Sequence, residues 1–295
     1  MTHGHANLAL LLVALIWGIT FVPQQLGMAH VGPLTFTSAR FLLGALFVLP
    51  WAWHEHVQLQ RSGIKVTPHD RLSWISLGVL LFLGCALQQI GLLYTTVSNA
   101  GFLTALYVPM VPLLFWLLER RQPHRSIWPL AAGSLVGTVL LTDASLDGWR
   151  TGDLLVLAST IFWAFHVVLL GAFVQRKPAP FQLSCIQFFA CSALAGLLAW
   201  MLEAPTVDAL RKALPTIAFT GVLSVGISFT LQVFAQRYAH PTHAAILLSS
   251  EILFATLAAQ IWLGERLSLL QWAGGLLIFV CIVAAQIIPV TKTQR

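Results

Sequence analysis

Charged residues are scarce in this sequence. Its 16 basic and 10 acidic residues make up 9% of 295, whereas a soluble globular domain carries about 25%. A water-soluble fold of this size has too few polar groups here to cover its surface. The composition therefore argues against a soluble enzyme, a disordered chain, a coiled coil and a nucleic-acid-binding protein.

Several motifs that carry chemistry are missing as well. The sequence has no Walker loop, no H-E-x-x-H and no G-x-S-x-G. We therefore expect no ATP hydrolysis within the chain, no enzymatic activity, no cofactor and no bound metal. The four cysteines lie inside apolar stretches without any C-x-x-C, which favours small buried residues over disulfides or ligands: Cys85, Cys185, Cys191 and Cys281.

What the sequence has instead is long apolar runs. Hydrophobic residues make up 58% of the chain, and the mean hydropathy is +0.82. Ten runs are long enough to cross a bilayer as helices and too long for barrel strands: 6–28, 34–53, 72–94, 99–119, 127–143, 152–174, 182–202, 214–236, 243–263 and 268–289. The sequence thus predicts an all-α membrane protein with ten transmembrane helices. The first run is interpreted as a helix of the mature protein, because no basic residue precedes it and it exceeds a signal-peptide core.

Lysine and arginine indicate the orientation. If the N-terminus is cytoplasmic, inner segments hold eleven of these residues and outer segments hold four, with Arg40 inside the second run. Positive charge concentrates on the cytoplasmic side of membrane proteins. We therefore predict a multi-pass protein of the cytoplasmic membrane with both termini inside.

The sequence also repeats itself. Residues 87–94 read LQQIGLLY and residues 231–238 read LQVFAQRY, at an offset of 144, while Trp17 matches Trp163 at an offset of 146. The repeat predicts two halves, 1–145 and 146–295, of five helices each. Because five is odd, the second half enters the membrane inverted, which is typical of secondary transporters.

Longer motifs carry a resemblance to a known family. They are Trp17-Gly18, Ala39-Arg40-Phe41, the stretch YTTVSNAGFLTALYVPMVPLLFWLLERR from Tyr94, GDLLVLASTIFWAF from Gly152, and SSEILFATLAAQIWLGERLSLLQWAGGLLI from Ser249. With these motifs, the chain resembles EamA-type members of the drug/metabolite transporter superfamily over nearly its whole length. The resemblance implies ten helices, a central cavity and passage, mostly export, of small metabolites such as amino acids. Family members often carry Glu-Pro where this chain has Glu251-Ile252, so the resemblance alone does not supply a kink there.

Polar and aromatic residues at mid-membrane depth are the candidates for contact with a solute, because such groups usually face the protein interior. Trp17 and Thr20 share a helix face, as do Trp163 and His166. The tryptophans would form flat walls of a cavity; the alternative is packing between helices. Gln88 and Gln232 would meet a zwitterion as donors and acceptors; the alternative is a hydrogen bond between helices.

Glu251 is the sharpest single position, near the centre of the ninth run. A carboxylate there suits proton coupling or a substrate amine. The alternatives are a structural hydrogen bond or pairing with Arg40. His166 is either a proton relay or a core histidine. The candidate solute-binding residues are Trp17, Thr20, Gln88, Asn99, Tyr107, Trp163, His166, Gln232 and Glu251.

Together these patterns predict a secondary transporter or facilitator of small organic metabolites that works by alternating access. Its partners would be the solute, membrane lipid and, as a candidate coupling ion, protons. The alternative function is a membrane-embedded enzyme such as a lipid-modifying transferase. An enzyme of that kind needs its polar groups near one leaflet, whereas a transporter gathers them at mid-depth.

Overall fold

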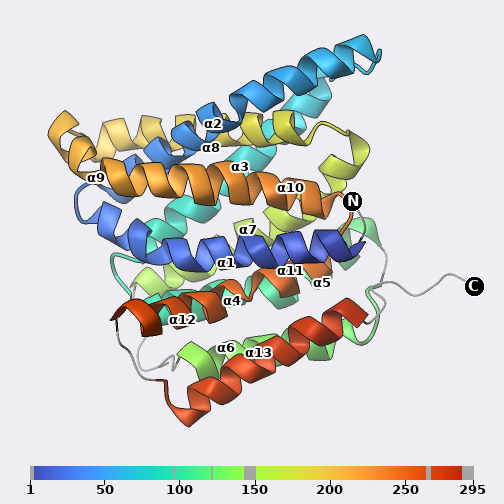
Figure 1. Ribbon diagram of the computed structural model, residues 1–295, viewed down its shortest axis with the longest axis vertical. Coiled ribbons are helices and arrows are strands. Elements are labelled where there is room, and N and C mark those ends of the chain that lie inside the picture. Colours follow the sequence, from blue (N-terminus) through green and yellow to red (C-terminus); the bar gives the residue numbers. More distant parts are fainter. Residues whose placement is uncertain (1–2, 96, 121, 143–150, 264–266, 288–295) are drawn as a thin grey trace, which may run out of the picture.

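The computed structural model describes residues 3–95, 97–120, 122–142, 151–263 and 267–287, and these residues form helices without a β-strand (Figure 1). Seven helical spans are long and apolar enough to cross a membrane: 4–28, 33–61, 68–91, 100–118, 151–176, 180–202 and 207–236. Three shorter apolar helices cover 127–141, 241–257 and 269–285. The chain is therefore a multi-pass membrane protein. Each predicted run is mostly helical where described, while ten crossings stay a prediction.

Seven of the helices are uninterrupted. They are α1 (His3–Met28), α2 (Pro33–Arg61), α3 (Pro68–Gly91), α6 (Ile127–Thr142), α7 (Thr151–Arg176), α8 (Pro180–Leu202) and α13 (Leu269–Ile287). Three further segments are interrupted. They consist of α4 (Val97–Ala105) with α5 (Tyr107–Glu119), of α9 (Val207–Phe219) with a π-helix (Thr220–Phe229) and α10 (Thr230–Gln236), and of α11 (Pro241–Leu248) with α12 (Glu251–Leu263).

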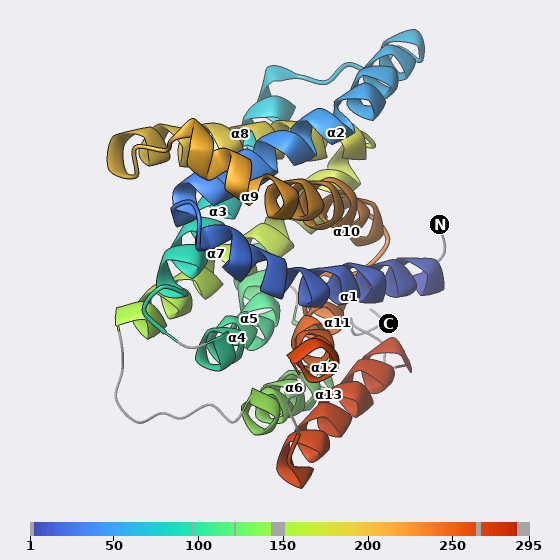
Figure 2. The same cartoon turned by 60° about the vertical axis from the view of Figure 1, so that its left-hand side comes forward.

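The bundle has a closely packed pair of helices on each of two sides. The pair α2 and α8 lies on one side and the pair α6 and α13 on the other, with α1, α5, α7 and α11 between them (Figure 2). Glycine lets α6 and α13 approach, since a side chain on Gly137 would come within 2.8 Å of the Gly274 carbonyl oxygen. The space between the two pairs is where a site for a small molecule can form.

The pair α2 and α8 is held at both ends by carboxylates. Glu203, just after α8, accepts hydrogen bonds from the backbone N–H groups of Leu34 (2.8 Å) and Thr35 (2.7 Å) at the start of α2. Glu55, near the end of α2, accepts from the backbone of Gln182 (2.8 Å) at the start of α8. The two helices are therefore antiparallel, and each carries the acid that caps the N-terminus of the other.

Hydroxyl and thiol groups join the same two helices between these caps. Ser38 Oγ donates to the Ser192 carbonyl oxygen at 3.0 Å, and Ser192 Oγ donates to the Ser38 carbonyl oxygen at 2.9 Å. Cys185 Sγ lies 3.8 Å from the Ala45 carbonyl oxygen in a matching contact. Ser38 and Cys185 are 147 positions apart, as are Ala45 and Ser192. The contacts of one helix thus recur on the other with the roles exchanged.

Local chemistry explains two of the interruptions. Pro109 has no N–H for the Ala105 carbonyl, and its ring crowds that carbonyl, so α4 ends at Ala105. Between α11 and α12 no proline is present. Instead Ser249 Oγ and Ser250 Oγ donate to the carbonyls of Ile246 (2.7 Å) and Leu247 (2.6 Å), which competes with the helical pattern. The break that a Glu-Pro motif would supply is therefore present here through two serines.

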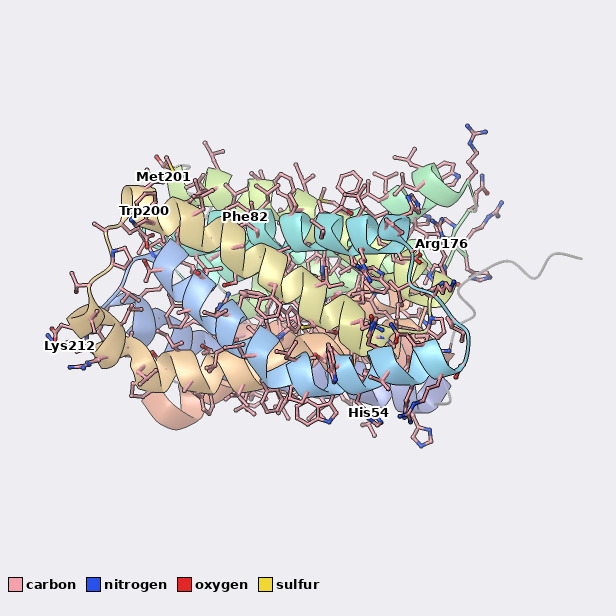
Figure 3. The ribbon with its side chains drawn as sticks, turned by 90° about the horizontal axis from the view of Figure 1, so that it is seen from above. His54, Phe82, Arg176, Trp200, Met201 and Lys212 are labelled. Atoms are coloured by element: carbon pink, nitrogen blue, oxygen red, sulfur yellow. The ribbon has the colours of Figure 1, made fainter. Side chains whose placement is uncertain are left out.

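The ends of the described chain lie at one end of the bundle. The start of α1 and the end of α13 are both on the right in Figure 1. His54 and Arg176 lie at this end, and Lys212 lies at the opposite end (Figure 3). Trp200 and Met201 are 75% and 65% exposed on the outer surface, where lipid would cover them.

The caps on α2 and α8 predict a specific loss of stability. Replacing Glu203 with Gln removes the charge that meets two backbone N–H groups and the Thr35 hydroxyl. We expect a loss of about 1–3 kcal/mol. The control is Asp208→Asn, because Asp208 is 76% exposed and pairs with Lys212 at the surface; its loss should be about 0.5 kcal/mol or less. Thermal unfolding in detergent measures both, and equal midpoints would contradict the capping role.

Candidate functional site

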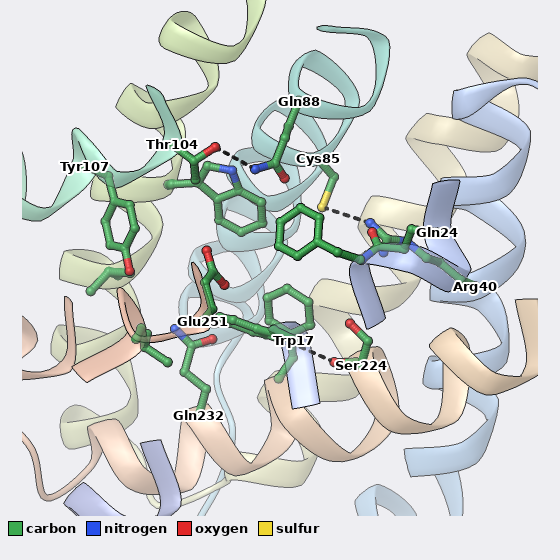
Figure 4. A pocket seen from close by; sticks show the side chains of 15 residues that line it. Trp17, Gln24, Arg40, Cys85, Gln88, Thr104, Tyr107, Ser224, Gln232 and Glu251 are labelled. Atoms are coloured by element: carbon green, nitrogen blue, oxygen red, sulfur yellow. Dashed lines mark hydrogen bonds between the residues drawn. The ribbon is translucent and has the colours of Figure 1, made fainter. Parts of the chain in front are cut away.

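A cavity is lined by residues of α1 to α5, α7, the π-helix and α10 to α12 (Figure 4). The space open to the centre of a water-sized sphere is about 70 Å³, whereas one water needs about 10–15 Å³. The cavity therefore has room for several waters or part of a small solute. Its lining residues are Trp17, Phe21, Gln24, Arg40, Cys85, Gln88, Thr104, Tyr107, Trp163, Val167, Ser224, Phe229, Gln232, Leu248 and Glu251.

Most of the residues predicted from the sequence meet at this cavity. Those that line it are Trp17, Gln88, Tyr107, Trp163, Gln232 and Glu251. Thr20 is buried beside it and donates to the Trp17 carbonyl oxygen at 2.9 Å. His166 is fully buried outside it, where Nε2 lies 3.0 Å from Gln187 Oε1. Solute contact by Thr20 and His166 stays a prediction, and the side chain of Asn99 lies outside the described residues.

Three aromatic rings form a continuous wall. The ring of Phe229 lies 4.6 Å from that of Trp17 and 6.3 Å from that of Trp163, centroid to centroid. Trp17 Nε1 donates to the Ser224 carbonyl oxygen at 3.2 Å, a carbonyl of the π-helix. Trp163 Nε1 is buried and has no hydrogen-bond partner among the described residues. One indole N–H is thus bound to the backbone, while the other has no partner among the described residues.

The polar groups of the cavity differ in whether they have hydrogen-bond partners. Gln88 Nε2 donates to Thr104 Oγ1 at 2.9 Å, and the Tyr107 hydroxyl donates to the Ala245 carbonyl oxygen at 3.3 Å. Gln232 Oε1 is buried without a partner among the described residues. Glu251 is the first residue of α12 and is 9% exposed. A carboxylate at a helix N-terminus is stabilised by the helix dipole, so the break before α12 favours an acid there.

Arg40 is the residue whose place the sequence did not settle. Its guanidinium donates to Gln24 Oε1 and approaches Cys85 Sγ at 3.8 Å. Ion pairs within the described part of the chain do not include Arg40 with Glu251, so the pairing considered as an alternative role for Glu251 is not present. Two features of the sequence could have indicated the contact between Arg40 and Gln24. Arg40 is a charge inside an apolar run, and Gln24 shares a helix face with Trp17.

The lining residues follow the internal repeat. Twelve of the fifteen form six pairs whose members stand 144 or 146 positions apart. The pairs are Trp17 and Trp163, Phe21 and Val167, Cys85 and Phe229, Gln88 and Gln232, Thr104 and Leu248, and Tyr107 and Glu251. Tyr107 and Glu251 each begin the second part of an interrupted helix. Positions that share an offset of 144 or 146 therefore line one cavity together.

The close approach of α1 to α12 explains why a glycine, Gly18, follows Trp17. A side chain on Gly18 would lie 2.5 Å from the Glu251 carbonyl oxygen and 2.8 Å from the Ala255 nitrogen, both backbone atoms. Only glycine thus lets α1 reach the start of α12. This close approach places Trp17 and Glu251 in the same cavity.

Replacing Gly18 with Ala should therefore destabilise the protein. The added carbon meets backbone atoms that cannot rotate away, and overpacking of this kind costs about 1–3 kcal/mol. Gly4→Ala, also in α1, is the matched control because an added carbon there meets nothing within 4 Å. Thermal unfolding should show a lower midpoint for the first variant alone. An unchanged midpoint for Gly18→Ala would mean that α1 and α12 are farther apart.

Comparison with known proteins agrees with this arrangement. The chain matches the EamA-like transporter family over residues 5–143 and 150–285. It is 29% identical to an uncharacterized transporter of Archaeoglobus fulgidus, covering 95% of this chain and 85% of that protein. It is 27% identical to a probable amino-acid metabolite efflux pump of Salmonella typhimurium, covering 91% and 90%.

A solved crystal structure has the same fold, with a TM-score of 0.79 at 20% identity over 96% of this chain and 97% of the other. The chain belongs to the EamA-like transporter family.

Proposed function

We propose that the protein is a secondary transporter or facilitator that moves small organic metabolites across the cytoplasmic membrane. The observation that carries this proposal is the central cavity, where Glu251, Arg40 and the aromatic wall face one small space. Charged groups inside a membrane protein usually mark a pathway for a solute or an ion. The name of the relative in Salmonella typhimurium favours amino acids as solutes and export as the direction.

The proposed mechanism is alternating access by two inverted halves, residues 1–145 and 146–295, with ten membrane crossings. Three observations support it: the six equivalent pairs around the cavity, the exchanged contacts of α2 and α8, and the ends of α1 and α13 at one end of the bundle. Two equivalent halves can exchange conformations around a fixed site. The excess of lysine and arginine in segments on the side of the termini supports a cytoplasmic location for both termini.

The position of the cavity argues against a lipid-modifying enzyme. Such an enzyme needs reactive groups that open to one leaflet. Here Trp17 and Trp163 come from the middles of α1 and α7, and the described residues hold no cluster of three or more His, Cys, Asp or Glu that would bind a metal. Polar groups at mid-depth are what a carrier requires.

Glu251 is the proposed coupling group. Within the described residues its carboxylate has no hydrogen bond or ion pair, so a proton or a substrate cation is the natural partner when the cavity is occupied. A buried carboxylate that exchanges these two partners links their movements. The direction of transport then follows the solute gradient, the proton gradient or both.

Transport by purified protein in vesicles tests the function. A panel of amino acids and amines should include a solute that enters or leaves faster than in empty vesicles, and an imposed pH gradient should change its rate. Glu251→Gln should remove the dependence on the pH gradient, because the amide binds no proton, whereas Glu251→Asp should keep it at a lower rate. If no solute crosses, the carrier function is wrong; if Glu251→Gln responds to the gradient as before, Glu251 does not couple protons.

The aromatic wall predicts selectivity for the apolar part of the solute. Trp163→Ala removes one face of the wall, so transport of aromatic and large apolar solutes should fall about tenfold or more relative to small ones, since a lost apolar contact is worth about 1–3 kcal/mol. Trp200→Ala is the control because Trp200 lies on the outer surface. Initial rates over a solute panel measure the ratio. A uniform change across all solutes would remove Trp163 from the pathway.

A further inference from the structure

The two charges of the cavity stand where the halves of the chain differ. The position equivalent to Glu251 holds Tyr107, which is 144 residues earlier. The position equivalent to Arg40, at the offset of 147 that relates α2 to α8, holds Gln187, which lies 3.0 Å from His166 and outside the cavity. An exchange between equivalent halves needs similar residues, not different ones. The two charges therefore serve something other than the exchange itself, which leaves binding of the solute for Arg40 and binding of the solute or a proton for Glu251.

Arg40 is a buried cation whose partners are incomplete. It is 4% exposed, and its charge lies 5.7 Å from the ring centre of Phe36 and 5.3 Å from that of Phe41. Nη1 donates to Gln24 Oε1, Nη2 approaches Cys85 Sγ, and Nε has no partner among the described residues. A guanidinium has five N–H donors. A buried guanidinium without a carboxylate costs free energy that an arriving anion would recover.

Its environment also fixes the guanidinium in place. Gln24 Oε1 accepts both from Arg40 and from Gln89 Nε2, the latter at 2.8 Å, so α1, α2 and α3 are joined at this point. Figure 4 shows Arg40, Gln24 and Cys85 on one side of the cavity and Glu251, Gln232 and Tyr107 on the other. The cavity thus has a cationic side and an anionic side, with the aromatic residues between them.

We propose that the cavity recognises solutes that carry a carboxylate and an ammonium group together, and that Arg40 is the residue that selects the carboxylate. The solute carboxylate accepts from the Arg40 guanidinium, the ammonium donates to Glu251, and the apolar part lies against Trp17, Trp163 and Phe229. This inference rests on the proposed transport function. It assigns Arg40, which the sequence offered only as a partner of Glu251, to the solute.

The alternative is that Arg40 only joins three helices. The two roles differ in their consequences for analogues of one solute. An analogue that lacks the carboxylate or the ammonium group leaves one buried charge of the site unpaired. A site built to hydrogen-bond a group rejects an analogue without that group by factors far above tenfold. A purely structural arginine leaves the choice between analogues unchanged.

The experiment uses L-leucine and three analogues with the same apolar part. These are leucinamide and isopentylamine, which lack the carboxylate, and 4-methylpentanoate, which lacks the amine. Vesicles containing the purified full-length protein are loaded with leucine, and exchange with each external compound is measured. We expect exchange with leucine to exceed exchange with each analogue by about 100-fold or more. Equal exchange with isopentylamine or leucinamide would overturn the assignment of Arg40.

Variants then separate recognition from structure. Arg40→Gln should remove the preference for leucine over isopentylamine while exchange of isopentylamine is retained, and Arg40→Lys should keep part of the preference. Lys177→Gln is the charge-matched control, because Lys177 pairs with Asp70 at 3.6 Å away from the cavity; its preferences should equal those of the parent. An equal fall for all four compounds in both Arg40 variants would show a structural role and overturn the proposal.

The parent protein alone also tests the proposal. If Arg40→Gln does not fold, the shift in thermal midpoint of the parent protein with leucine and with each analogue gives the same comparison, since a ligand that binds the folded state stabilises it. Stabilisation by leucine alone supports the assignment, and equal stabilisation by isopentylamine overturns it. If vesicles transport amines or carboxylates but no amino acid, the inference is wrong while the carrier function stands. If nothing is transported, the carrier function itself is wrong.

Discussion

The constraint behind the whole structure is that lipid offers no partner to a polar group. Every backbone N–H, carbonyl and charge within the bilayer must find its partner inside the protein. This requirement makes the chain helical along its apolar runs. It also explains why Glu203 and Glu55 are used at the starts of α2 and α8, where helical N–H groups have no partner of their own. Two buried polar atoms without a partner in the described chain, Trp163 Nε1 and Gln232 Oε1, belong to residues that line the cavity.

The cavity combines a repeated framework with two exceptions. The paired positions bring tryptophan opposite tryptophan and glutamine opposite glutamine, so both halves present similar surfaces to a solute. Such a framework suits a site that is approached from either side of the membrane. Arg40 and Glu251 have no charged equivalents, and they give the site a direction along which a solute with two unlike charges would lie. In the proposed carrier, the repeated positions would serve the exchange of conformations, and the two charges would serve selection of the solute.

The sequence predicted the helices and much of the cavity because both follow from repeated local signals. Trp17 and Trp163 mark equivalent helices, Gln88 and Gln232 mark another pair, and Glu251 stands out because a carboxylate in an apolar run is costly. Spacing along a helix shows which residues share a face, but it does not show which helix packs there. His166 shares a face with Trp163, yet α8 supplies Gln187 to it. Arg40 joins α1, α2 and α3 through contacts that are distant in sequence, so no local pattern indicates them.

The pair α2 and α8 resists bending, whereas the interrupted helices bend more easily. In α2 and α8, carboxylates cap both ends and serine hydroxyls join the centre, so separating the pair at either end breaks several hydrogen bonds at once. At Leu106 and at Ser249–Ser250 the helical hydrogen bonds are already interrupted, so a rotation there breaks few bonds. Tyr107 and Glu251 follow these two points directly, and both line the cavity. If the protein is a carrier, bending at these two breaks would move Tyr107 and Glu251 relative to Arg40, which lies on α2. Each conformational exchange would then change the distance between the two charges that hold the solute, which links release of the solute to the opening of the site.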